Sequence, residues 1–78
     1  MPDARRGPAL PWQRVAGNLR ERIAAGEWLP GEALPSVRKL AEEYGVSPPT
    51  VSRAVRALAG EGLVTVVPGW GTFVPERG

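Results

Sequence analysis

Apolar residues recur every three or four positions in two short stretches near the middle of the chain. The first stretch has Val37, Leu40, Ala41 and Tyr44 at these positions, and the second has Val51, Val55 and Leu58. This spacing is the period of a helix that buries one stripe of its surface. The pattern therefore predicts two amphipathic helices that follow one another closely.

The residues between these stretches predict where each helix begins and ends. Ser36 precedes the first stretch and can accept a hydrogen bond from an unpaired amide of the first helical turn. Gly45 follows the last apolar position, where glycine adopts the left-handed backbone that ends a helix without steric cost. Ser47 is a good cap for the second helix, and Pro48 suits its first position. Two helices joined by so short a turn must cross steeply, which is the layout of a helix-turn-helix.

The residues after the second helix predict a small sheet. A glycine-rich break at residues 60–62 precedes the β-branched segment 63–67, which is typical of a strand. Residues 68–71 then form a turn, and residues 72–74 return as a second strand. We also expect Leu34 to add a very short third strand. The predicted fold class is mainly α with a small β-hairpin: a winged helix-turn-helix with three helices and a two- to three-stranded wing sheet.

The remaining helix is expected near the N-terminus, from about Pro11 to Ala25, with Gly26 ending it. Its apolar side consists of Trp12, Val15, Ala16, Leu19 and Ile23. Its other side carries Gln13, Arg14, Arg20, Glu21 and Arg22, which is typical of an ordinary solvated face. Trp12 is either a core residue or a dimer contact, and core is the preferred interpretation.

The segments outside these elements are an N-terminal arm and a connector. Residues 1–11 contain three prolines and a pair of arginines but no apolar period, which predicts a disordered arm. A solvated tail is the preferred interpretation, and a basic extension that reaches DNA is the alternative. Prolines limit any helix in residues 27–35, where Trp28 is expected to pack against the first helix. We expect a single winged-helix domain over residues 12–75.

One side of the second helix of the helix-turn-helix should be exposed and basic. Pro49, Arg53 and Arg56 lie opposite the apolar stripe, with Ser52 on one flank and no acid among them. Arg53 or Arg56 has the reach and the forked geometry to bind guanine, and either could be the base-reading residue. Thr50 and Ser52 can form hydrogen bonds to phosphate or base edges. Pro49 either touches a thymine methyl group or stiffens the first turn, and we favour stiffening.

Composition excludes several classes of protein. A chain of 78 residues has room for one small domain. Without cysteine or histidine, neither a disulfide framework nor an ordinary zinc site is possible, so we expect no cofactor and no metal. No apolar run approaches the roughly 20 residues that span a bilayer, so we expect a cytoplasmic protein without membrane contact.

The overall charge is compatible with a nucleic-acid partner only if the basic residues lie on one side of the domain and the acidic residues face away from it. The formal net charge is +2, although the sequence pI of about 9.9 is typical of nucleic-acid-binding domains. Glu42, Glu43 and Glu61 would repel phosphate unless they face away from it. An enzyme is a distant alternative, because the chain lacks a plausible catalytic triad and a phosphate-cradling glycine loop.

Several spaced blocks of this chain resemble the DNA-binding domain of GntR-family bacterial transcription regulators. The blocks are residues 34–41, 45–47, 50–51, 61–64 and 69–74. Within that family, the segment from Ser47 to Ala54 is most similar to the branch called YtrA, and the resemblance extends from Trp12 to Val74. It implies a sequence-specific double-stranded DNA-binding domain whose recognition helix enters the major groove. Repression is the commoner behaviour in the family.

The resemblance also implies which residues touch DNA. Ser36 and Arg38, at the start of the first helix of the helix-turn-helix, are expected to approach the DNA backbone. The alternative for Arg38 is a surface salt bridge with Glu42, four residues further on. The full set of candidate DNA-binding residues is Ser36, Arg38, Ser47, Pro49, Thr50, Ser52, Arg53, Arg56 and Gly69.

The wing of this chain departs from the family pattern. Family wings often carry basic residues at the positions of Val67 and Trp70, although Gly69 and Gly71 still fit a tight hairpin turn. Three interpretations of Trp70 remain open. It stacks on a sugar of the DNA, it contacts a partner protein, or it folds back onto the core.

Two hypotheses of different classes follow. The first is a DNA-binding domain of a transcription regulator, working as a homodimer on a roughly palindromic operator, with no small-molecule effector site in this chain. The second is a winged helix used for protein association through Trp28, Trp70 and the valine-rich hairpin. The two arginines of the recognition helix favour the first.

Overall fold

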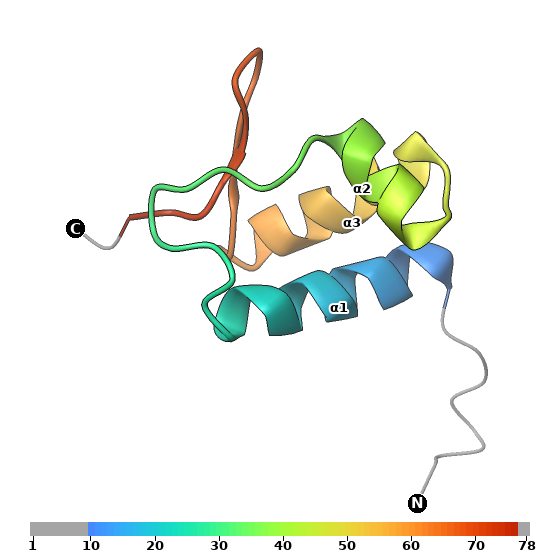
Figure 1. The fold of residues 1–78 in the computed structure, drawn as a ribbon, viewed down its shortest axis with the longest axis horizontal. Helices are drawn as coiled ribbons and strands as arrows, with labels where there is room; N and C mark the ends of the chain where they lie inside the picture. The colour runs from blue at the N-terminus through green and yellow to red at the C-terminus, as the bar shows by residue number, and fades with distance from the viewer. Residues whose placement is uncertain (1–9, 77–78) are drawn as a thin grey trace, which may run out of the picture.

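The fold consists of three helices and one hairpin. We analysed a computed structural model, which describes residues 10–76. The elements are α1 (Pro11–Ala24), α2 (Val37–Tyr44), α3 (Pro48–Gly60), β1 (Thr65–Val67) and β2 (Gly71–Phe73). Figure 1 shows α1 and α3 side by side, α2 lying across α3, and the hairpin projecting away from α1. This arrangement is a winged helix-turn-helix, as predicted.

The turn between α2 and α3 has the local chemistry predicted for it. The Ser36 Oγ accepts a hydrogen bond from the Lys39 amide at 3.1 Å and so caps α2. Gly45 ends that helix with a φ of 68°, in the left-handed region that glycine occupies without strain. The Ser47 Oγ lies 3.4 Å from the Thr50 amide and caps α3. The turn between the two helices is therefore set by two serine caps and one left-handed glycine.

The N-terminus of α1 is capped differently from those of α2 and α3. Leu10 precedes the helix and has no side-chain oxygen, but the Gln13 Oε1 accepts a hydrogen bond from the Leu10 amide at 3.0 Å. The helix ends at Ala24, one residue before the predicted end, and Gly26 follows with a φ of 83°. Residues 1–9, for which an arm was expected, lie outside the described residues.

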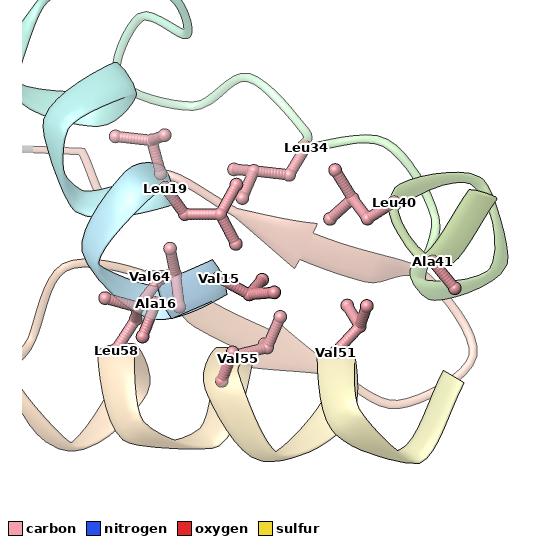
Figure 2. Packing of buried hydrophobic residues seen from close by; sticks show 12 residues of the cluster. Val15, Ala16, Leu19, Leu34, Leu40, Ala41, Val51, Val55, Leu58 and Val64 are labelled. Atoms are coloured by element: carbon pink, nitrogen blue, oxygen red, sulfur yellow. The ribbon is translucent and has the colours of Figure 1, made fainter. Parts of the chain in front are cut away.

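The core fills the space between the three helices. It contains twelve buried apolar residues: Val15, Ala16, Leu19, Leu34, Leu40, Ala41, Val51, Ala54, Val55, Leu58, Val64 and Val74. Figure 2 shows side chains from all three helices pointing toward one another, with Leu34 between Leu19 and Leu40. Each fully buried leucine or valine contributes about 1.5–3 kcal/mol relative to exposure. Trp12 and Trp28 are half-buried and pack against this core, which favours the core interpretation of Trp12.

The first strand of the wing is shorter than expected. A strand was predicted over residues 63–67, but β1 begins only at Thr65. Val64 is 3% exposed and belongs to the core, so its backbone leaves α3 toward the interior before pairing begins. The antiparallel register pairs Thr65 with Phe73 and Val67 with Gly71. The β-branched residues of this segment therefore have two functions: Val64 is buried in the core, and Thr65–Val67 pair with β2.

The hairpin turns through Pro68 and Gly69. The Trp70 amide donates to the Val67 carbonyl at 2.9 Å, which closes a four-residue turn. Gly69 has a φ of 82° at the third position of this turn, after a proline at the second, and this combination fits a type II turn. The tight turn predicted at this place is confirmed.

The connector before α2 supplies the expected third strand in minimal form. Ala33 forms an isolated antiparallel bridge with Phe73, and the Leu34 amide donates to the Thr72 carbonyl at 2.8 Å. Further along, the Val74 carbonyl and amide pair with Gly31 and Glu32 at 2.7 and 2.9 Å. The connector is thus bonded to the outer edge of β2, which fixes the wing relative to α2.

Candidate nucleic-acid interface

The exposed side of α3 carries the residues predicted for it. Val51, Ala54, Val55 and Leu58 form its buried side. On the opposite side Pro49, Arg53 and Arg56 are exposed, while Thr50 and Ser52 are half-buried at its two margins. No acidic residue belongs to the helix, because Glu61 lies just beyond its end. Among residues 10–76, the face is therefore basic and α3 itself contributes no carboxylate to it.

The two arginines of this face differ in their surroundings. The Arg53 guanidinium lies over the ring of Trp12, with its central carbon 4.9 Å from the ring centroid. Within residues 10–76, no ion pair or hydrogen bond joins the side chain of Arg56 to another residue. The helical period predicts that both arginines are exposed on the same side of α3. The packing of α1 against α3 distinguishes them, because only Arg53 contacts a residue of α1.

The start of α2 presents a second group of polar side chains. Ser36 is exposed, and its oxygen accepts the Lys39 amide, so its hydroxyl proton is still available to a phosphate oxygen. Arg38 is exposed as well. The alternative salt bridge between Arg38 and Glu42 does not form in the part of the chain that the structure describes.

Two of the three acidic residues that could repel phosphate are held by arginines of α1. Glu61 receives two hydrogen bonds from Arg20, with Nε to Oε1 at 2.9 Å and Nη2 to Oε2 at 2.6 Å. The Arg22 Nη1 lies 2.9 Å from the Glu43 Oε2. The hydrogen bond from Arg20 lowers the pKa of Glu61 from its ordinary value, and Arg20 has its own pKa raised by the same bond. Only Glu42 remains without such a partner among the described residues.

Arg22 is the centre of a small network rather than part of a wet face. Its guanidinium lies 4.7 Å from the ring centroid of Trp28 and donates to the Tyr44 Oη at 2.8 Å. The Arg22 Nε also donates to Glu27 at 2.8 Å, and this hydrogen bond is the main cause of a raised pKa of Arg22. The same contact lowers the pKa of Glu27. The expectation of an ordinary solvated face is wrong for this residue, which ties α1 to the end of α2.

The tip of the wing is apolar and open. Trp70 is 80% exposed, so the interpretation in which it folds back onto the core is wrong. Val66 and Val67, on β1, are exposed beside it. No lysine or arginine lies between residues 61 and 76, so the wing can offer only uncharged contacts. Gly69 is exposed in the turn, where its missing side chain lets another molecule approach the backbone.

Two further features of the described residues bear on function. Residues 10–76 contain no helix with the length and apolar character needed to cross a membrane. Within the same range, no group of three or more aspartate or glutamate side chains comes together in a way that would suit a metal ion.

Residues 11–74 match the family model described as "Bacterial regulatory proteins, gntR family". The chain belongs to the GntR family. The resemblance expected from the residues is confirmed, and the match extends over all three helices and both strands.

Relatives of this GntR-family chain are longer proteins. The mannosyl-D-glycerate transport/metabolism system repressor MngR of Escherichia coli is 42% identical over 66 residues, which are 85% of this chain and 28% of MngR. The transcriptional repressor YtrA of Bacillus subtilis is 35% identical over 66 residues, again 85% of this chain and 51% of YtrA. The chain thus spans between about a quarter and a half of these two relatives.

Solved structures of this GntR-family fold include complexes with DNA. The DNA-binding domain of AraR bound to operator ORX1 has a TM-score of 0.83 and 31% identity, covering 86% of this chain and 81% of that one. A GntR-family regulator from Listeria monocytogenes has a TM-score of 0.84 at 27% identity and covers 91% of this chain and 62% of that one. Both likenesses confirm the winged helix-turn-helix.

Proposed function

We propose that this chain is the sequence-specific double-stranded DNA-binding domain of a bacterial transcription regulator that acts as a repressor. The observation that carries the proposal is the exposed face of α3, where Arg53 and Arg56 stand without an acid. The pairing of Glu43 and Glu61 with arginines of α1 removes two sources of repulsion. The likeness to an operator-bound AraR domain supports the same conclusion.

In this proposal α3 enters the major groove. Arg56, whose side chain has no ion pair or hydrogen bond within residues 10–76, binds the O6 and N7 atoms of a guanine. Ser52 and Thr50 at the margins of the face form hydrogen bonds to base edges or phosphate. Pro49 stiffens the first turn, since it is followed by a well-formed helix capped at Ser47.

The start of α2 and the wing complete the contact. Ser36 and Arg38 bind phosphate, helped by the amides and the positive dipole at the start of the helix. Ser47 lies at the start of α3 and approaches the backbone there. Gly69 and Trp70 offer an uncharged contact from the wing tip, with the indole stacked against a sugar. Base reading is therefore assigned to α3, and positioning to α2 and the wing.

The domain acts in pairs. A homodimer on a roughly palindromic operator would double these contacts and set the spacing of half-sites by geometry. This role requires no cofactor, no small-molecule site within the domain and no enzymatic chemistry. Occupancy of the operator alone is enough to block transcription.

The deciding experiment is a selection from a random-sequence duplex pool at two salt concentrations. We expect a recovered consensus, and retention that falls steeply as salt rises because several phosphates are neutralised. Arg56→Gln should abolish the consensus, whereas Arg20→Gln removes the same charge from a paired residue of α1 and should preserve it. No retention of any duplex at low salt would refute the proposal.

A second candidate function, protein association, is favoured by one observation only. Trp70, Val66 and Val67 are exposed large apolar side chains of the wing, with the two valines on opposite faces of β1. Sedimentation of the chain with and without Trp70→Ala separates the two uses of these side chains. Loss of self-association without loss of DNA binding would assign the wing to protein contact.

A further inference from the structure

Two arginines of this domain lie over tryptophan rings, and their N–H groups differ in the hydrogen bonds that they form within the fold. Arg22 lies 4.7 Å from the ring centroid of Trp28, and its N–H groups are occupied by Glu27, Glu43 and Tyr44. Arg53 lies 4.9 Å from the ring centroid of Trp12. No hydrogen bond or ion pair within residues 10–76 occupies the Arg53 donors. In the first contact the arginine's N–H groups are bound within the fold, whereas in the second no group of residues 10–76 binds the forked donor.

Trp12 is held firmly enough to fix the arginine above it. It lies in the first turn of α1, is half-buried and packs against the core. Arg53 lies in α3, so the contact exists only because α1 and α3 are side by side (Figure 1). A guanidinium stacked on an aromatic face keeps its N–H groups in the plane of the group, where they can still bind an acceptor.

The surroundings of this contact contain no acid that would repel an anionic acceptor. A shallow hollow beside it is lined by Leu10, Pro11, Trp12, Pro49, Thr50 and Arg53. None of these residues is acidic, and Thr50 and Pro49 belong to the first turn of α3. The Arg53 guanidinium therefore lies beside the first turn of α3, on the face assigned above to the major groove.

We propose that Trp12 is a positioning residue for DNA binding, which holds the Arg53 guanidinium in the orientation that contacts the duplex. This inference rests on the proposed function. An unrestrained arginine loses many rotamers when it binds, and that ordering weakens affinity. Here the ordering occurs on folding, because the tryptophan ring selects the rotamer in advance. Residues of α1 thereby influence recognition without touching DNA.

The test is a double-mutant cycle on the duplex recovered with the wild-type chain. Trp12→Leu removes the aromatic face, and Arg53→Gln removes the guanidinium. We expect Trp12→Leu to weaken binding by about two- to fivefold in the wild-type background, the range of one exposed cation–π contact. It should have no further effect when Arg53 is already Gln. The cycle thereby isolates the pair from general effects on the fold.

Two variants serve as controls. Trp12→Phe keeps an aromatic face and removes an indole N–H that is buried without a partner among the described residues, so it should restore binding to within about twofold of wild type. Arg56→Gln should lose the same factor of affinity with or without Trp12→Leu. Denaturant unfolding of each variant gives the folded fraction, and Trp12→Met replaces Trp12→Leu if the latter does not fold.

Three results would overturn the inference while leaving the proposed function intact. Equal weakening by Trp12→Leu in both backgrounds would assign its effect to the fold. An unchanged affinity would show that the stack does not matter, and tighter binding would show that Trp12 withholds the arginine from DNA. Absence of binding by the wild-type chain at low salt would instead refute the proposed function.

Discussion

Arg20 and Arg22 of α1 have the same charge as Arg38 and Arg56 of the helix-turn-helix but different surroundings. Arg20 and Arg22 point to acids from other parts of the chain, and each forms at least one ion pair. Arg38 and Arg56 are exposed and form none within residues 10–76. The first pair joins elements of the fold, and the second pair is the one proposed to contact DNA.

This division explains how a domain with a formal net charge of only +2 can present a strongly basic face. Each acid bound by α1 is an acid whose field near α3 is partly cancelled. The total charge stays the same, but its distribution becomes one-sided. For binding to a polyanion, sidedness matters more than the sum, because only nearby charges escape screening at physiological salt.

The largest effect is expected when Arg38 and Arg56 are both replaced. Arg38→Gln/Arg56→Gln should weaken binding to the recovered duplex by about 100-fold or more, since one phosphate contact and one base contact are lost. The slope of log affinity against log salt should fall by about one for the phosphate contact. A fluorescence anisotropy titration at several salt concentrations measures both. An unchanged slope would mean that Arg38 does not contact phosphate.

A substitution at Arg22 tests whether this arginine stabilises the fold without contributing to DNA binding. Arg22→Met keeps an unbranched apolar side chain but removes the guanidinium, which leaves Glu27, Glu43 and Tyr44 without their donor. We expect the free energy of unfolding to fall by about 1–2 kcal/mol, measured by urea denaturation. Affinity for DNA, corrected for the folded fraction, should hardly change. A large loss of corrected affinity would place Arg22 in the DNA contact and break the comparison.

Trp70 at the tip of the wing allows an uncharged DNA contact to be compared with those proposed for the arginines. Trp70→Ala removes the exposed indole, and we expect DNA affinity to fall by about five- to tenfold, at the lower end of the range for one stacked aromatic contact. Neither the salt slope nor the free energy of unfolding should change, because the side chain neutralises no phosphate and packs against nothing in the core. A changed slope would contradict an uncharged contact.

The smallest effect concerns the acids that α1 holds. Hydrogen bonds from arginine lower the pKa values of Glu61 and Glu27 in the folded state. A lowered pKa means stability that is present above the ordinary glutamate pKa of about 4.3 and is lost as pH falls through the lower, folded value. Thermal unfolding between pH 6 and pH 3 should show this loss. Because both pairs are exposed, the decrease should be slight.

A control keeps the acid experiment specific. In Glu27→Gln/Glu61→Gln both titrating groups are absent, so the decrease below about pH 4.3 should become smaller. An equal decrease in this variant and in the wild type would assign the pH dependence to other carboxylates.

Features set by a few neighbouring residues could be predicted from the sequence. Ser36, Gly45 and Ser47 each act within one helical turn, and the structure confirms the cap or the left-handed backbone expected at each. The buried sides of the helices follow from periodicity alone. The contacts of the candidate DNA-binding residues with DNA stay predictions, although the exposed side on which α3 presents them was found from the same periodicity.

Features set by packing between distant segments could not be predicted. The contact of Arg53 with Trp12 depends on how α1 lies against α3, and nothing in either local sequence specifies it. The network of Arg22 has the same origin. The start of β1 was misplaced because the β-branched Val64 serves the core, and composition alone does not separate burial from strand pairing.

The hydrogen bonds between Val74 and residues 31–32 have a mechanical consequence. Val74 is bonded to Gly31 and Glu32, and Leu34 to Thr72, just before the cap of α2 at Ser36. A pull on the chain beyond Val74 is therefore transmitted to the start of α2 before it reaches the wing tip. A force applied beyond β2 therefore acts first on the segment that leads into α2, the helix proposed above to contact the phosphates.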